Sequence, residues 1–174
     1  MAITKNKEEV RLKSGNNFKV YHNSAWITLG NIISGKITKQ SGTQEIKFAD
    51  GESFEKKTSR KCMLEIVLAQ VSKEILDTID DLLTGTKRLY YYNGVGNSKH
   101  MELYAPEAEC IENLDFEMKA DSHQTVALKF SLYPQSTNAS VTPNTDLPSD
   151  KYATGGTLVT GTNPYYVLLE TTVS

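Results

Sequence analysis

Histidine and cysteine side chains are the first candidates for chemistry in this sequence of 174 residues. The three histidines, His22, His100 and His123, have no spacing that would place two of them on one element as metal ligands. Cys62 and Cys110 lie in alternating runs and outside any C-x-x-C motif, so we expect buried, reduced thiols. These residues therefore predict neither a metal site nor a catalytic thiol.

A group of carboxylates, Asp77, Asp80 and Asp81, could also suggest a metal site. The group lacks the flanking glycine turns of a calcium loop, which favours a solvated helix face. The sequence also has no glycine-rich phosphate loop and no G-x-S-x-G motif. We therefore expect no enzyme activity and no cofactor.

A run of three tyrosines at 90–92 follows Lys87 and Arg88. Aromatic and basic side chains of this kind stack on bases in proteins that bind single-stranded nucleic acid. Ordinary strand chemistry explains the run equally well, because aromatic residues favour pleated surfaces. A pI near 5.9 lacks the basic character of most nucleic-acid binders.

The composition is that of a soluble globular protein, with 39% hydrophobic and 23% charged residues. No run approaches the roughly 18 apolar residues of a membrane span, and the amino terminus lacks the apolar core of a secretory signal. We therefore expect a protein made in a cytoplasm, without a membrane partner.

Charge is distributed unevenly along the chain. Residues 1–61 contain 12 basic and 6 acidic residues, whereas residues 62–174 contain 7 basic and 15 acidic residues. If the two parts occupy different surfaces, copies of the chain would attract one another head to tail. The alternative, that the two parts interleave in the fold and their fields cancel, stays open at this point.

Alternating apolar residues predict two strands early in the chain. The first covers about 26–38 with Ile27, Leu29, Ile33 and Ile37 on one side, and a bulge or bend is expected at Gly30 or Gly35. The second follows at about 43–54. Asp50-Gly51 is a strong signal for a hairpin turn.

The stretch 60–83 changes its period. Its first half alternates, with Cys62, Leu64, Ile66 and Leu68 on one face and a half-polar second face, so both faces should touch something. Its second half predicts an amphipathic helix at about 72–83, capped by Ser72. A helix this short is marginal alone and must lie on a sheet.

The later half of the sequence predicts mainly strands. The clearest hairpin is "IENLDFEMK" with "HQTVALKFSLY", in which the apolar residues of both strands alternate with polar ones. The polar side of this hairpin gives a candidate lumen or interface face, made of Asn113, Asp115, Glu117, Lys119, Thr125 and Lys129.

The expected organisation is one mainly β domain over 1–133, a β-sandwich or partly closed barrel with one amphipathic helix packed on the sheet. Four of the five prolines lie between Pro134 and Pro164, which predicts an extended loop or arm over 134–164. Residues 165–174 alternate again and predict a terminal strand that returns to the sheet.

The order of strands, two-faced strand, helix and clean hairpin resembles the tail tube (major tail) proteins of bacteriophages and the tube proteins of contractile injection systems. The segments "GESFEKKTSRKCMLEIVLAQVSKEILDTIDDLLTG" and "IENLDFEMKADSHQTVALKFSLY" account for the resemblance. Neither segment is a diagnostic motif, and the region 134–164 departs from a minimal tube subunit.

The resemblance implies a structural virion protein, made in the bacterial cytoplasm, that assembles into hexameric rings. The rings would stack head to tail into a tail tube, contact other tail proteins, and pass DNA without sequence-specific binding. It also implies loops and arms that bridge the rings, here residues 39–61 with the cationic cluster Lys56, Lys57, Arg60 and Lys61, and the late arm at 134–164. The alternatives are a monomeric β-barrel that binds a ligand and another tail component, such as a terminator, baseplate or decoration protein.

Overall fold

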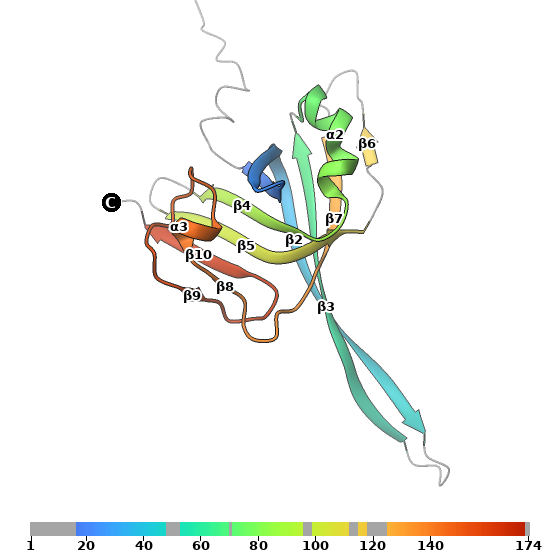
Figure 1. The fold of residues 1–174 in the computed structure, drawn as a ribbon. Coiled ribbons are helices and arrows are strands. Elements are labelled where there is room, and N and C mark those ends of the chain that lie inside the picture. Colours follow the sequence, from blue (N-terminus) through green and yellow to red (C-terminus); the bar gives the residue numbers. More distant parts are fainter. Residues whose placement is uncertain are drawn as a thin grey trace, which may run out of the picture.

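The computed structural model describes residues 17–47, 53–69, 71–95, 99–111, 115–117 and 125–172. Over these residues the chain is mainly β, and Figure 1 shows its arrangement. The elements in chain order are β1 Asn17–His22, β2 Ala25–Lys47, β3 Ser53–Ala69, α2 Lys73–Leu83, β4 Lys87–Val95, β5 Lys99–Cys110, β6 Asp115–Glu117, β7 Thr125–Leu132, β8 Ser140–Val141, α3 Pro143–Asp146, β9 Val159–Thr160 and β10 Val167–Thr172.

Within the described residues, six antiparallel strands close into a barrel. The neighbours run in the order β5, β4, β1, β2, β3 and β7, and a pairing of β5 with β7 at Ala108–Cys110 closes the ring. The sequence left open a sandwich or a partly closed barrel; the sandwich is wrong, and the barrel is closed. The reason is that β5 is long enough to pair with β4 along one edge and to share its other edge between β7 and β10.

The barrel interior is filled with side chains from alternate positions of its strands. Val126, Leu128, Phe130 and Leu132 of β7 are buried, as expected for this strand. The inner face of β3 is buried in the same way, while Met63, Glu65 and Val67 of its outer face are half-buried. Phe18 and Phe130 meet across the interior with ring centroids 5.6 Å apart.

Helix α2 follows β3 and lies at one end of the barrel (Figure 1). The Ser72 hydroxyl caps it by accepting from the Ile75 N–H at 3.3 Å, as the sequence predicted. One face of the helix is buried in the barrel core, through Ile79, Leu82 and Leu83. The carboxylates on its other face are exposed, namely Asp77, Asp80 and Asp81.

Three register shifts interrupt the pairing of β2. Opposite β1 the register shifts between Phe18 and Lys19, next to Gly30. Opposite β3 it shifts between Ile32 and Ser34 and again between Ser41 and Thr43. The first agrees with the bulge expected at Gly30 or Gly35. At the second, Ile33 has no pairing partner and is 53% exposed, contrary to expectation, while Ile32 packs against the core.

Residues 134–166, here called the strap, lie folded against the outside of the barrel. A second apolar core forms between the strap and the outer faces of β4, β5 and β10. Its buried members are Tyr90, Tyr92, Tyr104, Ala139, Val141, Leu147, Ala153, Val167 and Leu169. The segment was expected as an extended loop or arm; the structure shows a long loop with two short strands and a short helix, held on the barrel by this core.

Candidate functional site

The most conspicuous feature of the molecule is a two-stranded ribbon that extends far beyond the barrel (Figure 1). We define it as residues 39–47 of β2 and 53–61 of β3. The strand β2 pairs with β1 at Ala25–Asn31, and β3 pairs with β7 at Cys62–Ala69. Beyond those regions β2 and β3 pair with each other as far as Lys47 and Ser53. The hairpin turn expected at Asp50-Gly51 lies outside the described residues.

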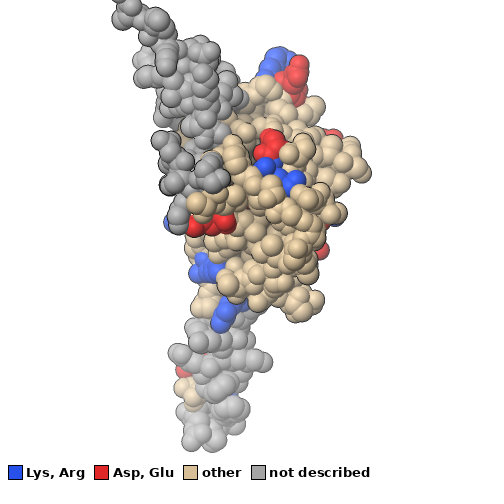
Figure 2. Space-filling model, turned by 90° about the vertical axis from the view of Figure 1, so that its left-hand side faces the viewer, with Lys and Arg blue, Asp and Glu red and all other residues tan. Residues whose placement is uncertain are grey.

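The base of the ribbon is basic. Lys39, Arg60 and Lys61 are exposed there, next to Lys36 on the same strand pair. Figure 2 shows basic side chains at the end of the barrel where the ribbon, drawn largely in grey, begins. Lys56 and Lys57 belong to β3, and the structure does not describe their side chains. The predicted cationic interface cluster therefore lies along one strand of the ribbon.

The predicted lumen or interface face is described in part. Thr125 and Lys129 are half-buried on the outer face of β7, and the ammonium of Lys129 lies 3.9 Å from a Glu65 carboxylate oxygen. Asp115 and Glu117 belong to β6, where they pair with Ala127 and Thr125. Asn113 and Lys119 lie outside the described residues. The role of this face stays a prediction.

The ribbon and the strap meet where the ribbon leaves the barrel. The Tyr165 hydroxyl donates to the Arg60 carbonyl oxygen at 2.8 Å. The Lys39 ammonium lies 4.9 Å from the centroid of the Tyr166 ring, a cation–π contact. Both tyrosines are buried in the barrel core. The strap therefore contacts both strands of the ribbon at its base.

A buried carboxylate holds the strap on the barrel. Glu102, on the outer face of β5, is fully buried and accepts three hydrogen bonds. The donors are the Tyr90 hydroxyl at 2.5 Å and the backbone N–H groups of Tyr152 and Ala153, each at 2.7 Å. Sequence reasoning missed Glu102, since an isolated acid in a strand ordinarily faces solvent.

An ion pair adds a second polar link between the barrel and the strap. Lys19 of β1 is buried, and its ammonium pairs with the carboxylate of Asp150 in the strap. The two residues are 131 positions apart in the chain. The pair therefore links the first described strand to a segment near the carboxyl end.

The three-tyrosine run has a structural role in the described fold. Tyr90 and Tyr92 are buried under the strap, and Tyr91 packs against the barrel interior. Tyr152 of the strap stacks on Tyr92 at 4.4 Å and on His100 at 4.1 Å between ring centroids. This burial removes the faces of Tyr90 and Tyr92 from solvent and argues against stacking on nucleic-acid bases.

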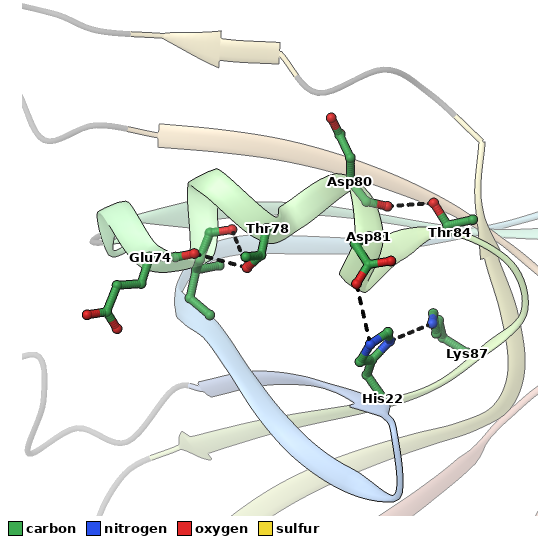
Figure 3. A network of polar contacts seen from close by, with 8 residues as sticks. His22, Glu74, Thr78, Asp80, Asp81, Thr84 and Lys87 are labelled. Carbon is green, nitrogen blue, oxygen red and sulfur yellow. Dashed lines mark hydrogen bonds and ion pairs between the residues drawn. The ribbon is translucent and has the colours of Figure 1, made fainter.

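Two of the three histidines make local polar contacts. His22 Nδ1 lies 2.8 Å from the Lys87 ammonium, and His22 Nε2 lies 3.7 Å from Asp81 of α2 (Figure 3). The Tyr92 hydroxyl lies 2.6 Å from His100 Nδ1. His123 is outside the described residues. Among the residues that the structure describes, no group of three or more His, Cys, Asp and Glu side chains could hold a metal ion.

Neither Cys62 nor Cys110 forms a disulfide; Cys62 is buried, as the sequence predicted, whereas Cys110 is half-buried. Cys62 is buried, and its desolvation raises the pKa of the thiol, an effect that nearby Lys39 partly offsets. A thiol with a raised pKa is a weak nucleophile at neutral pH. In the described part of the chain, no helix is both long and apolar enough for a membrane span.

Comparisons with known proteins found no matching family model and no matching curated protein. Two solved structures are similar at low sequence identity. The first is a chain of a virion of the native gene transfer agent particle, 9% identical, with a TM-score of 0.42 and coverage of 66% of this chain and 88% of that chain. The second is a chain of the tail of the empty particle with C6 symmetry, 6% identical, with a TM-score of 0.44 and coverage of 74% and 93%.

Proposed function

We propose that this protein is a structural subunit of a phage-type tail that assembles with copies of itself into stacked rings, forming a tube through which DNA passes. The observation that favours this function is the ribbon. A two-stranded hairpin alone in water is marginally stable at best, because it lacks a packed face. A barrel that is already closed gains nothing from extending two of its strands into solvent. A partner surface would supply the missing contacts.

The ribbon also offers the chemistry of a docking element. Its outer edges have backbone donors and acceptors available for pairing with another chain. Lys39, Arg60 and Lys61 are exposed at its base, and the sequence adds Lys56 and Lys57. These cations would favour a partner surface that carries negative charge.

Such a surface exists at the opposite end of the barrel, where helix α2 lies (Figure 1). Its exposed carboxylates are Glu74, Asp77, Asp80 and Asp81, and they outnumber the exposed cation Lys73, whose ammonium pairs with Asp77 at 2.6 Å. A basic end and an acidic end on one molecule favour head-to-tail association of identical copies.

The rival function of a monomeric ligand-binding barrel has less support. A barrel of eight strands is just wide enough for its interior to be filled by side chains, and fewer strands leave less room. Here six strands close around a continuous apolar core that includes Phe18, Ile66 and Phe130. A terminator, baseplate or decoration protein remains the alternative within tail components.

Electron microscopy of the purified protein tests the proposal. Rings or tubes are expected, and stacked tubes distinguish a tube subunit from a terminator, which would form single rings. Small uniform particles at high protein concentration, with the sedimentation coefficient of a monomer, would contradict assembly.

Reversing the charges of the ribbon tests its role. The variant with Lys56, Lys57, Arg60 and Lys61 all changed to Glu should remain folded and lose assembly, because like charges would face the partner surface. The matched control exchanges Lys for Arg and Arg for Lys at the same four positions and should assemble. Circular dichroism and urea unfolding check that both variants fold. Normal assembly of the reversed variant would remove the cluster from the interface.

A further inference from the structure

We infer that the strap is an internal brace that fixes the direction of the ribbon relative to the barrel, and not an arm that reaches a neighbouring subunit. The inference deepens the proposed function and rests on it, since a fixed direction of the ribbon would matter for its docking on another subunit. The brace itself is a property of the single chain. Three sets of contacts among described residues carry it, and they join the barrel wall to the strap and the strap to the ribbon.

The first set holds the ribbon. Arg60 on β3 pairs with Ser41 on β2, and Lys39 on β2 pairs with Cys62 on β3, so both contacts of the strap lie at the ribbon base. Tyr165 holds the backbone at Arg60 through its hydroxyl. Tyr166 holds the side chain of Lys39 through its ring. Two consecutive residues of the strap thus contact one strand each.

The second set anchors the strap to the barrel wall. The Glu102 carboxylate is fully buried and uses both oxygens on strap backbone groups, one on Tyr152 and one on Ala153. Burying a carboxylate is costly unless hydrogen bonds replace its hydration, and here three donors do so. Such a site is sharply dependent on position, because a small shift of the strap would leave a buried charge without its donors.

The third set makes the strap one unit. Two backbone hydrogen bonds, each 2.8 Å long, join the beginning of the strap to its end. The Ala139 N–H donates to the Asn163 carbonyl oxygen, and the Gly161 N–H donates to the Ala139 carbonyl oxygen. Gly161 is packed so closely that an added Cβ would lie 3.0 Å from the Tyr166 carbonyl oxygen. A displacement of the strap at its anchor is therefore transmitted to Tyr165 and Tyr166.

A distance measurement between spin labels tests the brace in the monomer. One label is placed at Lys47 near the far end of the ribbon and one at Ala127 on the barrel, both through a non-canonical amino acid so that the native thiols remain. The wild-type protein should give a narrow distance distribution. Tyr165→Phe, which removes one hydroxyl, and Glu102→Gln, which removes one charge, should each broaden it.

Matched controls remove the same groups elsewhere. Tyr133→Phe loses a hydroxyl bonded to Glu109, and Glu107→Gln loses an exposed charge on β5. Both should keep the narrow distribution. If Glu102→Gln fails to fold, the Tyr165→Phe comparison still decides the matter. A folded Tyr165→Phe protein with an unchanged distribution would overturn the brace.

The measurement separates the brace from the proposed function, because it is made at concentrations where the protein is monomeric. Broadening in the two brace variants, together with a wild-type protein that never forms rings, would retain the brace and reject the tube. An unchanged distribution in a protein that assembles normally would reject the brace and retain the tube.

Discussion

The tyrosine hydroxyls on the outer faces of β4 and β5 are held in their protonated form by their surroundings. Burial raises the pKa of Tyr90, and the hydrogen bond to Glu102 and the charge of that carboxylate raise it further. Burial also raises the pKa of Tyr92, with smaller contributions from Tyr152 and Glu102, and raises the pKa of Tyr104 to about 12. The strap and the barrel wall therefore meet at a surface where the tyrosines stay neutral beside the carboxylates of Glu102 and Asp150.

This arrangement predicts a loss of stability in alkali. Because the pKa of Tyr90 is higher in the folded protein than its ordinary value of 10.0, its contribution is fully present below pH 10 and is lost as the pH rises further. Tyr90→Phe should lose about 1.5–3 kcal/mol at neutral pH, the usual value of a hydrogen bond to a charged group. The variant should also show a shallower decline above pH 10. Urea unfolding across this pH range measures both effects, and an equally steep decline would contradict the assignment.

At the scale of the element, two glycines of β2 differ, because there is no room for a side chain at Gly30, whereas there is room at Gly35. At Gly30 an added Cβ would lie 3.0 Å from the Ala69 carbonyl oxygen and 3.2 Å from a methyl group of Val71. At Gly35 the nearest atom would be 4.0 Å away. The bulge beside Gly30 brings the backbone of β2 close to the end of β3 and leaves no room for a side chain.

Two alanine substitutions test this difference. Gly30→Ala should destabilise the protein by about 1–3 kcal/mol, the usual cost of overpacking a rigid site. Gly35→Ala, the matched control on the same strand, should be neutral or stabilise by up to about 1 kcal/mol, because it restricts the unfolded chain. Urea unfolding measures both. Equal effects at the two positions would mean that the close approach at Gly30 is relieved by movement of β3.

At the scale of the whole molecule, two elements with opposite exposed charges lie at opposite ends of the barrel. The exposed lysines and arginine of the ribbon base lie at one end, and the four exposed carboxylates of α2 lie at the other (Figure 1). The sequence could not choose between separated and interleaved charges, because the choice depends on where the ribbon and the helix are placed. Their placement at opposite ends favours the separated arrangement for these two elements.

Association driven by attraction between the basic ribbon base and the carboxylates of α2 should weaken as the salt concentration rises. Raising the salt concentration from about 0.05 M to about 1 M shortens the screening length to about 3 Å and should shift assembled species toward monomers. Sedimentation velocity measures the shift. The urea midpoint of the monomer serves as a control and should change little. Assembly that is unaffected or strengthened by salt would point to apolar contacts or strand pairing in place of charge.

Local patterns in the sequence determined the β-rich class, the core face of β3 and β7, and helix α2 with its Ser72 cap. These features follow from periodicity and capping, which act between residues that are close in the chain. The burial of Cys62 was also predictable. The strand β1 was missed, because "NFKVYH" is short and follows a polar leader, and its turn uses Asn23 and Ser24 with positive φ rather than a glycine.

Tertiary structure alone decided the closure of the barrel, the direction of Ile33, the burial of Glu102 and the position of the strap. Each depends on more than the local pattern: closure on β5 meeting β7, and the Glu102 anchor on backbone groups 50 and 51 positions away. A one-residue bulge reverses which side of a strand a residue faces, and the alternating pattern does not record it. The periodicity of the sequence determines which face of an element is apolar. Packing in the folded chain determines which distant segment buries that face.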